Sequence, residues 1–163
     1  MSTGATRSQD RPAVDAALLV VRVVVGVIFA LHGSQKLFGA FGGPGLEAMV
    51  QPPPNGMGPL GYLVTIGEFF GGLGLIVGFL TRFSAASLIV IMLGAIFMVH
   101  GKNGFFMGHG PESKLIDAGF EYNLALIGLL VPTLVAGPGW WAVGRCLPLP
   151  KSKKTGRVVV GLE

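Results

Sequence analysis

The feature that most constrains this chain is a carboxylate, Glu68, in the middle of an apolar run from about Pro59 to Phe79. The run is long enough to cross a bilayer, since a spanning helix needs about 20 mainly apolar residues. An ionised carboxylate near the bilayer centre costs at least ~3 kcal/mol on insertion scales. Glu68 must therefore face other parts of the protein and either have a partner or carry a proton.

The composition is that of an integral membrane protein. Of the 163 residues, 51% are hydrophobic and only 12% are charged, whereas soluble domains carry about 25% charged residues. The net charge of +4 comes largely from the two tails, and we interpret it as a mark of membrane topology rather than of nucleic-acid binding. The single cysteine, Cys146, excludes an intrachain disulfide, a CxxC redox pair and a metal site built from four cysteines.

The hydrophobic pattern predicts an all-α fold, an integral membrane four-helix bundle. The membrane helices are expected over residues 16–38, 59–79, 84–100 and 121–136. Loops rich in glycine and proline interrupt this pattern at residues 39–58 and 101–120. The transmembrane domain is expected to cover residues 16–144, between a disordered N-terminus of residues 1–15 and a basic tail of residues 145–163.

The distribution of lysine and arginine predicts how the bundle is oriented. Nine of the 12 cations would lie on the side of the two termini: Arg7, Arg11, Arg22, Arg82, Arg145, Lys151, Lys153, Lys154 and Arg157. The other three, Lys36, Lys102 and Lys114, would lie on the side of the long loops. Because cytoplasmic segments carry an excess of lysine and arginine, we expect both termini in the cytoplasm and both long loops outside.

Ionisable side chains inside the predicted helices indicate a polar site in the outer half of the membrane. His32 and Lys36 are one helical turn apart, so their side chains are neighbours. We expect them to form a catalytic site with Glu68, which lies near the midplane. The residues expected to bind a ligand beside them are Phe29, His100, Glu121 and Asn123. An alternative for Lys36, and also for Arg22, is that the side chain snorkels to the nearest interface.

Several short motifs occur in a fixed order along the chain. They are Arg22 and Gly26 with Phe29-x-x-His32-Gly33-x-x-Lys36-Leu37-Phe38, Glu68-x-x-Gly71-Gly72-x-x-Leu75, Gly78-x-x-Thr81-Arg82, Gly104-Phe105-Phe106, Glu121-Tyr122-Asn123-Leu124 and Gly137-Pro138-Gly139. In these motifs the chain resembles the DoxX family of small four-helix membrane proteins, over about residues 18–139. The resemblance implies a multi-pass protein of the bacterial inner membrane.

The same resemblance implies a role in redox chemistry. DoxX-like proteins are often described as oxidoreductase subunits, and relatives act in thiosulfate oxidation with quinone as the acceptor or in thiol and oxidative-stress handling. We therefore expect an oxidoreductase, or the membrane subunit of one, that binds a quinone or another apolar ligand from the membrane lipid. Because no haem or iron–sulfur motif is visible, a redox partner protein is implied. A homo-oligomer is compatible with this interpretation, and a nucleic-acid partner is not expected.

Two other interpretations stay open at this point. In the first, the protein is a non-catalytic membrane scaffold that recruits a partner through its outer loops, and its buried charges only fix the helix register. In the second, it binds a metal, because several side chains are of suitable ligand types: His32, Glu68, His100, His109 and Glu121. No two of them have the spacing of a known metal motif, so the metal ligands remain unknown.

Overall fold

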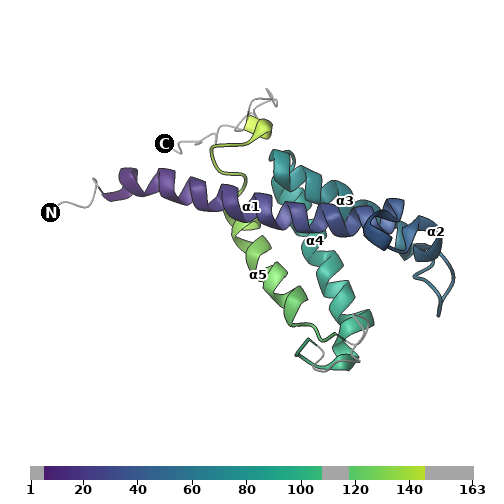
Figure 1. Cartoon of the computed structure of the whole chain (residues 1–163). Coiled ribbons are helices and arrows are strands. Elements are labelled where there is room, and N and C mark those ends of the chain that lie inside the picture. The colour runs from purple at the N-terminus through teal and green to yellow at the C-terminus, as the bar shows by residue number, and fades with distance from the viewer. Residues whose placement is uncertain (1–5, 108–117, 146–163) are drawn as a thin grey trace, which may run out of the picture.

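The structure, a computed structural model, describes residues 6–107 and 118–145, and in these ranges the protein is all-helical, without strands. The four longest helices are α1 (Thr6–Phe38), α3 (Leu60–Val77), α4 (Thr81–Ala95) and α5 (Glu121–Ala136) (Figure 1). The short elements are η1 (Ala40–Gly42), α2 (Gly45–Met49), the π-helical turn η2 (Ile96–His100), η3 (Gly101–Asn103) and η5 (Val143–Arg145). The sequence expectations for His109 and for the tail after Arg145 concern residues outside these ranges.

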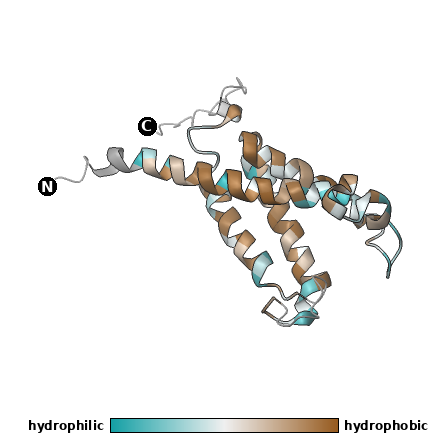
Figure 2. Ribbon diagram, viewed as in Figure 1, coloured by the Kyte–Doolittle hydropathy of each residue, from teal (hydrophilic) through white to brown (hydrophobic). Residues whose placement is uncertain are grey.

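Several helices have the length and composition of membrane spans. In the described part of the chain, three helical segments qualify: Arg11–Phe38, Leu60–Val77 and Thr81–Asn103. The helix α5 is apolar but shorter. Figure 2 shows hydrophobic residues along most of α1, α4 and α5, and hydrophilic residues near the connection from α4 to α5. The prediction of an all-helical protein with several spans is confirmed, and a fourth span formed by α5 stays a prediction.

Two of the helices begin earlier than the sequence predicted. The helix α1 begins at Thr6 instead of Ala16 and includes a segment expected to be disordered. Propagating a helix adds one hydrogen bond per ordered residue, so a polar segment continues a helix that its apolar neighbour has formed. The helix α4 begins at Thr81 instead of Ser84, because the turn before it is tighter than expected. Gly78 and Leu80 turn the chain with φ angles of 72° and 47°.

The helices α1 and α3 pack against each other more extensively than any other pair of described elements. A Cβ atom on Gly72 would lie 2.5 Å from the main-chain nitrogen of Ala30 and 2.7 Å from the main-chain oxygen of Gly26. A Cβ atom on Gly33 would collide with the main chain of Phe69. Small residues allow membrane helices to approach this closely, and the approach brings the C-terminal half of α1 against the middle of α3.

The helices α4 and α5 form a second pair. This pair diverges from α1 and α3 toward the connection that joins α4 to α5 (Figure 1). A hydrophobic core holds the two pairs together, and its members come from all four long helices: Val25, Phe29, Leu75, Ala85, Leu88, Met92, Leu126 and Leu130. The core thus joins all four long helices.

Arg22 does not snorkel to the interface, so that interpretation of the sequence is wrong. Its side chain is buried, with 2% of its surface exposed. Nη1 donates a hydrogen bond of 2.8 Å to the carbonyl oxygen of Pro138, and Nη2 donates one of 2.5 Å to that of Trp141. Arg82 donates to the carbonyl oxygen of Val135 over 3.0 Å. Two arginines thus bind main-chain oxygens at and after the end of α5, and Arg22 takes the more buried position.

Candidate functional site

A pocket of about 410 Å³ lies between α1, α3, α4 and α5, next to the connection that joins α4 to α5. Its volume is within the range of roughly 300–1,000 Å³ that is typical of small-molecule sites. Six of the seven predicted site residues line it: Phe29, His32, Lys36, Glu68, His100 and Asn123. The pocket therefore brings together predicted site residues from α1, α3, α5 and η2. The functional role of these residues stays a prediction.

An ion pair between Lys36 and Glu68 joins α1 to α3 at the pocket wall. The Nζ atom of Lys36 lies 2.5 Å from Oε1 and 2.6 Å from Oε2 of Glu68. The Glu68 side chain is 3% exposed, whereas that of Lys36 is 25% exposed. The ammonium group therefore compensates a carboxylate that would otherwise be buried alone at high cost. Lys36 does not snorkel, and its third N–H remains for a ligand in the pocket.

The two histidines of the pocket are each held by a hydrogen bond between Nδ1 and a main-chain oxygen. The Nδ1 atom of His32 lies 2.9 Å from the carbonyl oxygen of Ile28, and that of His100 lies 2.9 Å from the carbonyl oxygen of Ala118. Because a carbonyl oxygen only accepts hydrogen bonds, each Nδ1 carries a proton, and in the neutral form of each ring Nε2 keeps a lone pair. Among the described residues, neither Nε2 atom has a hydrogen-bond partner.

The inner part of the pocket is mainly apolar. Phe29 belongs to the hydrophobic core and is 2% exposed, and Leu126 and Met92 line the pocket beside it. Asn123 is buried, and its Nδ2 atom donates to the Sδ atom of Met92 over 3.4 Å. This contact leaves the second N–H of Asn123 as a donor and its side-chain oxygen as an acceptor. A few polar groups thus border an apolar space, as in many sites for apolar ligands.

Glu121, the seventh predicted site residue, is not among the residues that line the pocket. Its Oε1 atom accepts a hydrogen bond of 2.8 Å from the main-chain N–H of Met107. Its own main-chain N–H donates to the carbonyl oxygen of Phe105 over 2.9 Å. Glu121 thus connects the start of α5 to the segment after η3, and through it to the rim of the pocket, where Met107 lies.

Sequence reasoning did not select two polar residues that line the pocket, Gln35 and Tyr122. Gln35 is three residues from His32 on α1, a spacing that places both on one side of a helix. The ring of Tyr122 lies beside that of His32, with 6.3 Å between the ring centroids. Gln35 could have been found in the sequence as a polar residue at helical spacing from His32. Tyr122 could have been found because it directly precedes Asn123 in the family motif.

A metal site has no support in the described residues. Within residues 6–107 and 118–145, no group of three or more His, Cys, Asp or Glu side chains is close enough to hold a metal ion. His109, one of the ligand types considered from the sequence, lies outside these ranges. The two histidines that line the pocket are both bonded through Nδ1 to main-chain oxygens.

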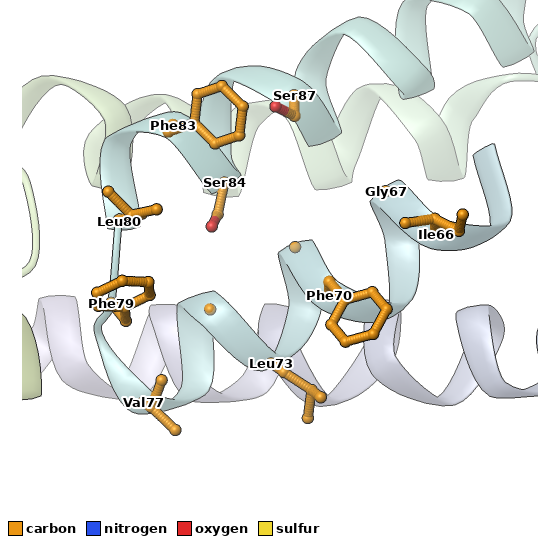
Figure 3. A pocket seen from close by; sticks show the side chains of 12 residues that line it. Ile66, Gly67, Phe70, Leu73, Val77, Phe79, Leu80, Phe83, Ser84 and Ser87 are labelled. Atoms are coloured by element: carbon orange, nitrogen blue, oxygen red, sulfur yellow. The ribbon is translucent and has the colours of Figure 1, made fainter. Parts of the chain in front are cut away.

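A second cavity, of about 440 Å³, lies between α3 and α4 near the turn that joins them. Figure 3 shows its lining, which includes the aromatic rings of Phe70, Phe79 and Phe83, with the hydroxyl group of Ser84 directed between the two helices. No ionisable side chain is among its lining residues. The first pocket is therefore the better candidate for chemistry.

Comparisons with known proteins find one family model and one relative that match the chain. A family model described as DoxX matches residues 17–101. The inner membrane protein YqjF of Escherichia coli (strain K12) is 29% identical to the chain over 136 residues, which cover 82% of this chain and 93% of that protein. No solved structure matches.

Proposed function

The chain belongs to the DoxX family and is a multi-pass inner-membrane protein, and from this premise we propose that it binds a quinone or a similar apolar redox ligand. The proposed site is the pocket lined by His32, Lys36 and Glu68. In this role the protein is an oxidoreductase, or the membrane subunit of one. The ligand enters from the lipid and places its polar head against these three side chains.

The observation that carries the proposal is the convergence of ionisable groups on one apolar pocket. Phe29, Met92 and Leu126 provide an apolar surface for a ring or an isoprenoid chain. Lys36 has an N–H left to donate to a ligand oxygen, and the Nε2 atoms of His32 and His100 are able to accept. Groups of these types also hold and release protons, which quinone chemistry requires.

An oxidoreductase role requires a second protein that carries electrons. The chain has one cysteine, Cys146, so it has no internal dithiol to exchange. Helices without a redox cofactor do not carry electrons over long distances, and the sequence has no haem or iron–sulfur motif. The partner supplies or removes electrons at the pocket, and the proposed protein supplies the binding site and the proton-binding groups.

The proposed topology places both termini in the cytoplasm and all four long helices across the membrane. Nine cations against three support this orientation. The N–H of Trp140 donates to the Asp15 carboxylate over 3.1 Å, so the N-terminal half of α1 and the segment after α5 lie together. The pocket lies toward the opposite ends of these helices, in the proposed outer half of the membrane.

The experiment that tests the function measures quinone binding to the protein in lipid nanodiscs, corrected for partitioning into empty nanodiscs. We expect Glu68→Gln and Lys36→Met each to weaken binding by about tenfold or more, because each removes or unpairs a charge at the polar head. Lys102→Met is the matched control. Lys102 is exposed on η3 and does not line the pocket, so binding should be unchanged.

Thermal unfolding of the same variants distinguishes a functional ion pair from a purely structural one. Each single variant should lose roughly 1–4 kcal/mol of unfolding free energy, because the remaining member of the ion pair has no opposite charge beside it. The loss is limited because the Lys36 side chain is partly exposed. The double variant Lys36→Met with Glu68→Gln should regain stability without regaining quinone binding. Unchanged quinone binding in all three variants would support the scaffold alternative instead, as would a wild-type protein that binds no quinone.

A further inference from the structure

We infer that the pocket binds the reduced, hydroxyl-bearing form of its ligand, the quinol, more tightly than the quinone. This inference rests on the proposed function and specifies the ligand of the same site. A quinone presents two carbonyl oxygens, which only accept hydrogen bonds, whereas a quinol presents two hydroxyl groups, which donate as well as accept. The preference of the pocket therefore depends on whether its own free groups are acceptors or donors.

The histidines offer acceptors. The proton on Nδ1 of His32 is committed to the carbonyl oxygen of Ile28, and that of His100 to the carbonyl oxygen of Ala118. Both hydrogen bonds are internal to the protein, so ligand exchange does not disturb them. In its neutral form each ring then has only the Nε2 lone pair for a ligand. A hydroxyl group satisfies that lone pair, while a quinone carbonyl would place its own lone pairs against it.

Asn123 can serve both forms of the ligand. One N–H of its amide group donates to Met92, with 3.4 Å between Nδ2 and Sδ, so a second N–H and the side-chain oxygen are left for other contacts. The N–H donates to a carbonyl or a hydroxyl oxygen, and the oxygen accepts from a hydroxyl group. Asn123 therefore does not reverse the preference that the histidines give.

The ion pair does not reverse this balance. Both oxygens of Glu68 accept from Lys36, so the carboxylate is already satisfied by a charged donor. The third N–H of Lys36 is a donor, and it binds a hydroxyl oxygen as well as a carbonyl oxygen because both have lone pairs. Lys36 therefore contributes to both ligand forms. Gln35 and Tyr122, which also line the pocket, both donate and accept, so the difference between the forms comes from His32 and His100.

The test compares three ligands of nearly equal shape in anaerobic nanodiscs: decylubiquinone, decylubiquinol and the dimethyl ether of that quinol. The ether keeps the aromatic ring and has no O–H donor. We expect the quinol to bind about tenfold more tightly than either of the other two, from two additional hydrogen bonds to otherwise unpaired acceptors. Binding is corrected for partitioning of each ligand into empty nanodiscs.

Variants assign the preference to the histidines. His32→Phe and His100→Phe keep an aromatic ring and remove the acceptor, so each should weaken quinol binding more than quinone binding and lower the ratio of quinol to quinone affinity toward one. Tyr62→Phe is the control, because Tyr62 is exposed on α3 and does not line the pocket. A destabilised fold would weaken both ligands together and would leave the ratio unchanged.

The outcomes separate this inference from the proposed function. Equal affinity for quinone and quinol in the wild-type protein would overturn the inference and leave the proposed function in place. The absence of binding by both ligands would overturn the proposed function itself. A tenfold ratio that persists in both histidine variants would contradict the proposal that His32 and His100 are the acceptors that favour the quinol.

Discussion

At the scale of single residues, Arg22 shows how a charged side chain is accommodated inside a membrane helix. Its guanidinium binds two carbonyl oxygens, those of Pro138 and Trp141, on a segment that follows α5. The planar guanidinium presents several N–H donors in fixed directions, so one side chain is able to bridge two acceptors. Its Nε atom has no partner among the described residues, which makes the two remaining hydrogen bonds the main compensation for burial.

Arg22→Lys should therefore destabilise the protein even though the charge is kept. An ammonium group on a flexible chain does not reproduce the bridge between Pro138 and Trp141, and we expect a loss of about 1–3 kcal/mol of unfolding free energy. Thermal unfolding in detergent measures this loss. Arg82→Lys is the control, since Arg82 is exposed and makes one hydrogen bond. Equal midpoints for the two variants would refute a special role for Arg22.

The sequence indicates which residues are chemically unusual better than it indicates their partners. The spacing of His32 and Lys36 and the position of Glu68 in an apolar run pointed to one location, and the structure places all three on one pocket. The partners of Arg22 were not predictable, because they are main-chain oxygens 116 and 119 residues away. Every residue has a carbonyl oxygen, so such an acceptor leaves no mark in the sequence.

At the scale of helices, the type of element was predictable and its ends were less so. The predicted C-terminal end of α1 and both predicted ends of α3 and α5 lie within a few residues of the observed ends. The reason is that the hydrophobic pattern stops at these positions. The polar start of α1 was missed, since polarity is not a signal that ends a helix. The π-helical turn Ile96–His100 was also missed, and such a turn shifts the direction of His100 relative to an α-helix.

The pairing of α1 with α3 gives a test at this scale. Gly72→Ala should destabilise the protein by about 1–3 kcal/mol or more, because the new Cβ would meet the main chain of Ala30 and Gly26, which cannot move aside as a side chain does. Gly94→Ala is the matched control, since no atom lies within 4 Å of its added Cβ. It should be neutral or slightly stabilising, because alanine is favoured over glycine in a helix.

Folded yield and the midpoint of thermal unfolding in the same detergent measure both variants. A similar loss in Gly72→Ala and Gly94→Ala would show that the close approach of α1 to α3 is not required. A loss confined to Gly72→Ala would support it.

At the scale of the whole molecule, the arrangement predicts which surfaces face the cytoplasm. Cysteines are introduced one at a time at Gln51 and Arg11 in a Cys146→Ser background, and a membrane-impermeant thiol reagent is added to spheroplasts. Gln51→Cys, in the connection between α2 and α3, should react in intact spheroplasts. Arg11→Cys, near the start of α1, should react only after lysis. The reverse pattern would overturn the proposed orientation.

The contact between Arg22 and the segment after α5 also has a consequence for biosynthesis. Translation proceeds from the N-terminus, so α1 enters the membrane while the residues that bind its arginine have not yet been made. Arg22 lacks Pro138 and Trp141 as partners until the segment that carries them, 116 and 119 residues later in the chain, has been made. During that interval another group must solvate the guanidinium, such as water, a lipid phosphate or the insertion machinery. That group must be released when the carbonyl oxygens of Pro138 and Trp141 bind Arg22.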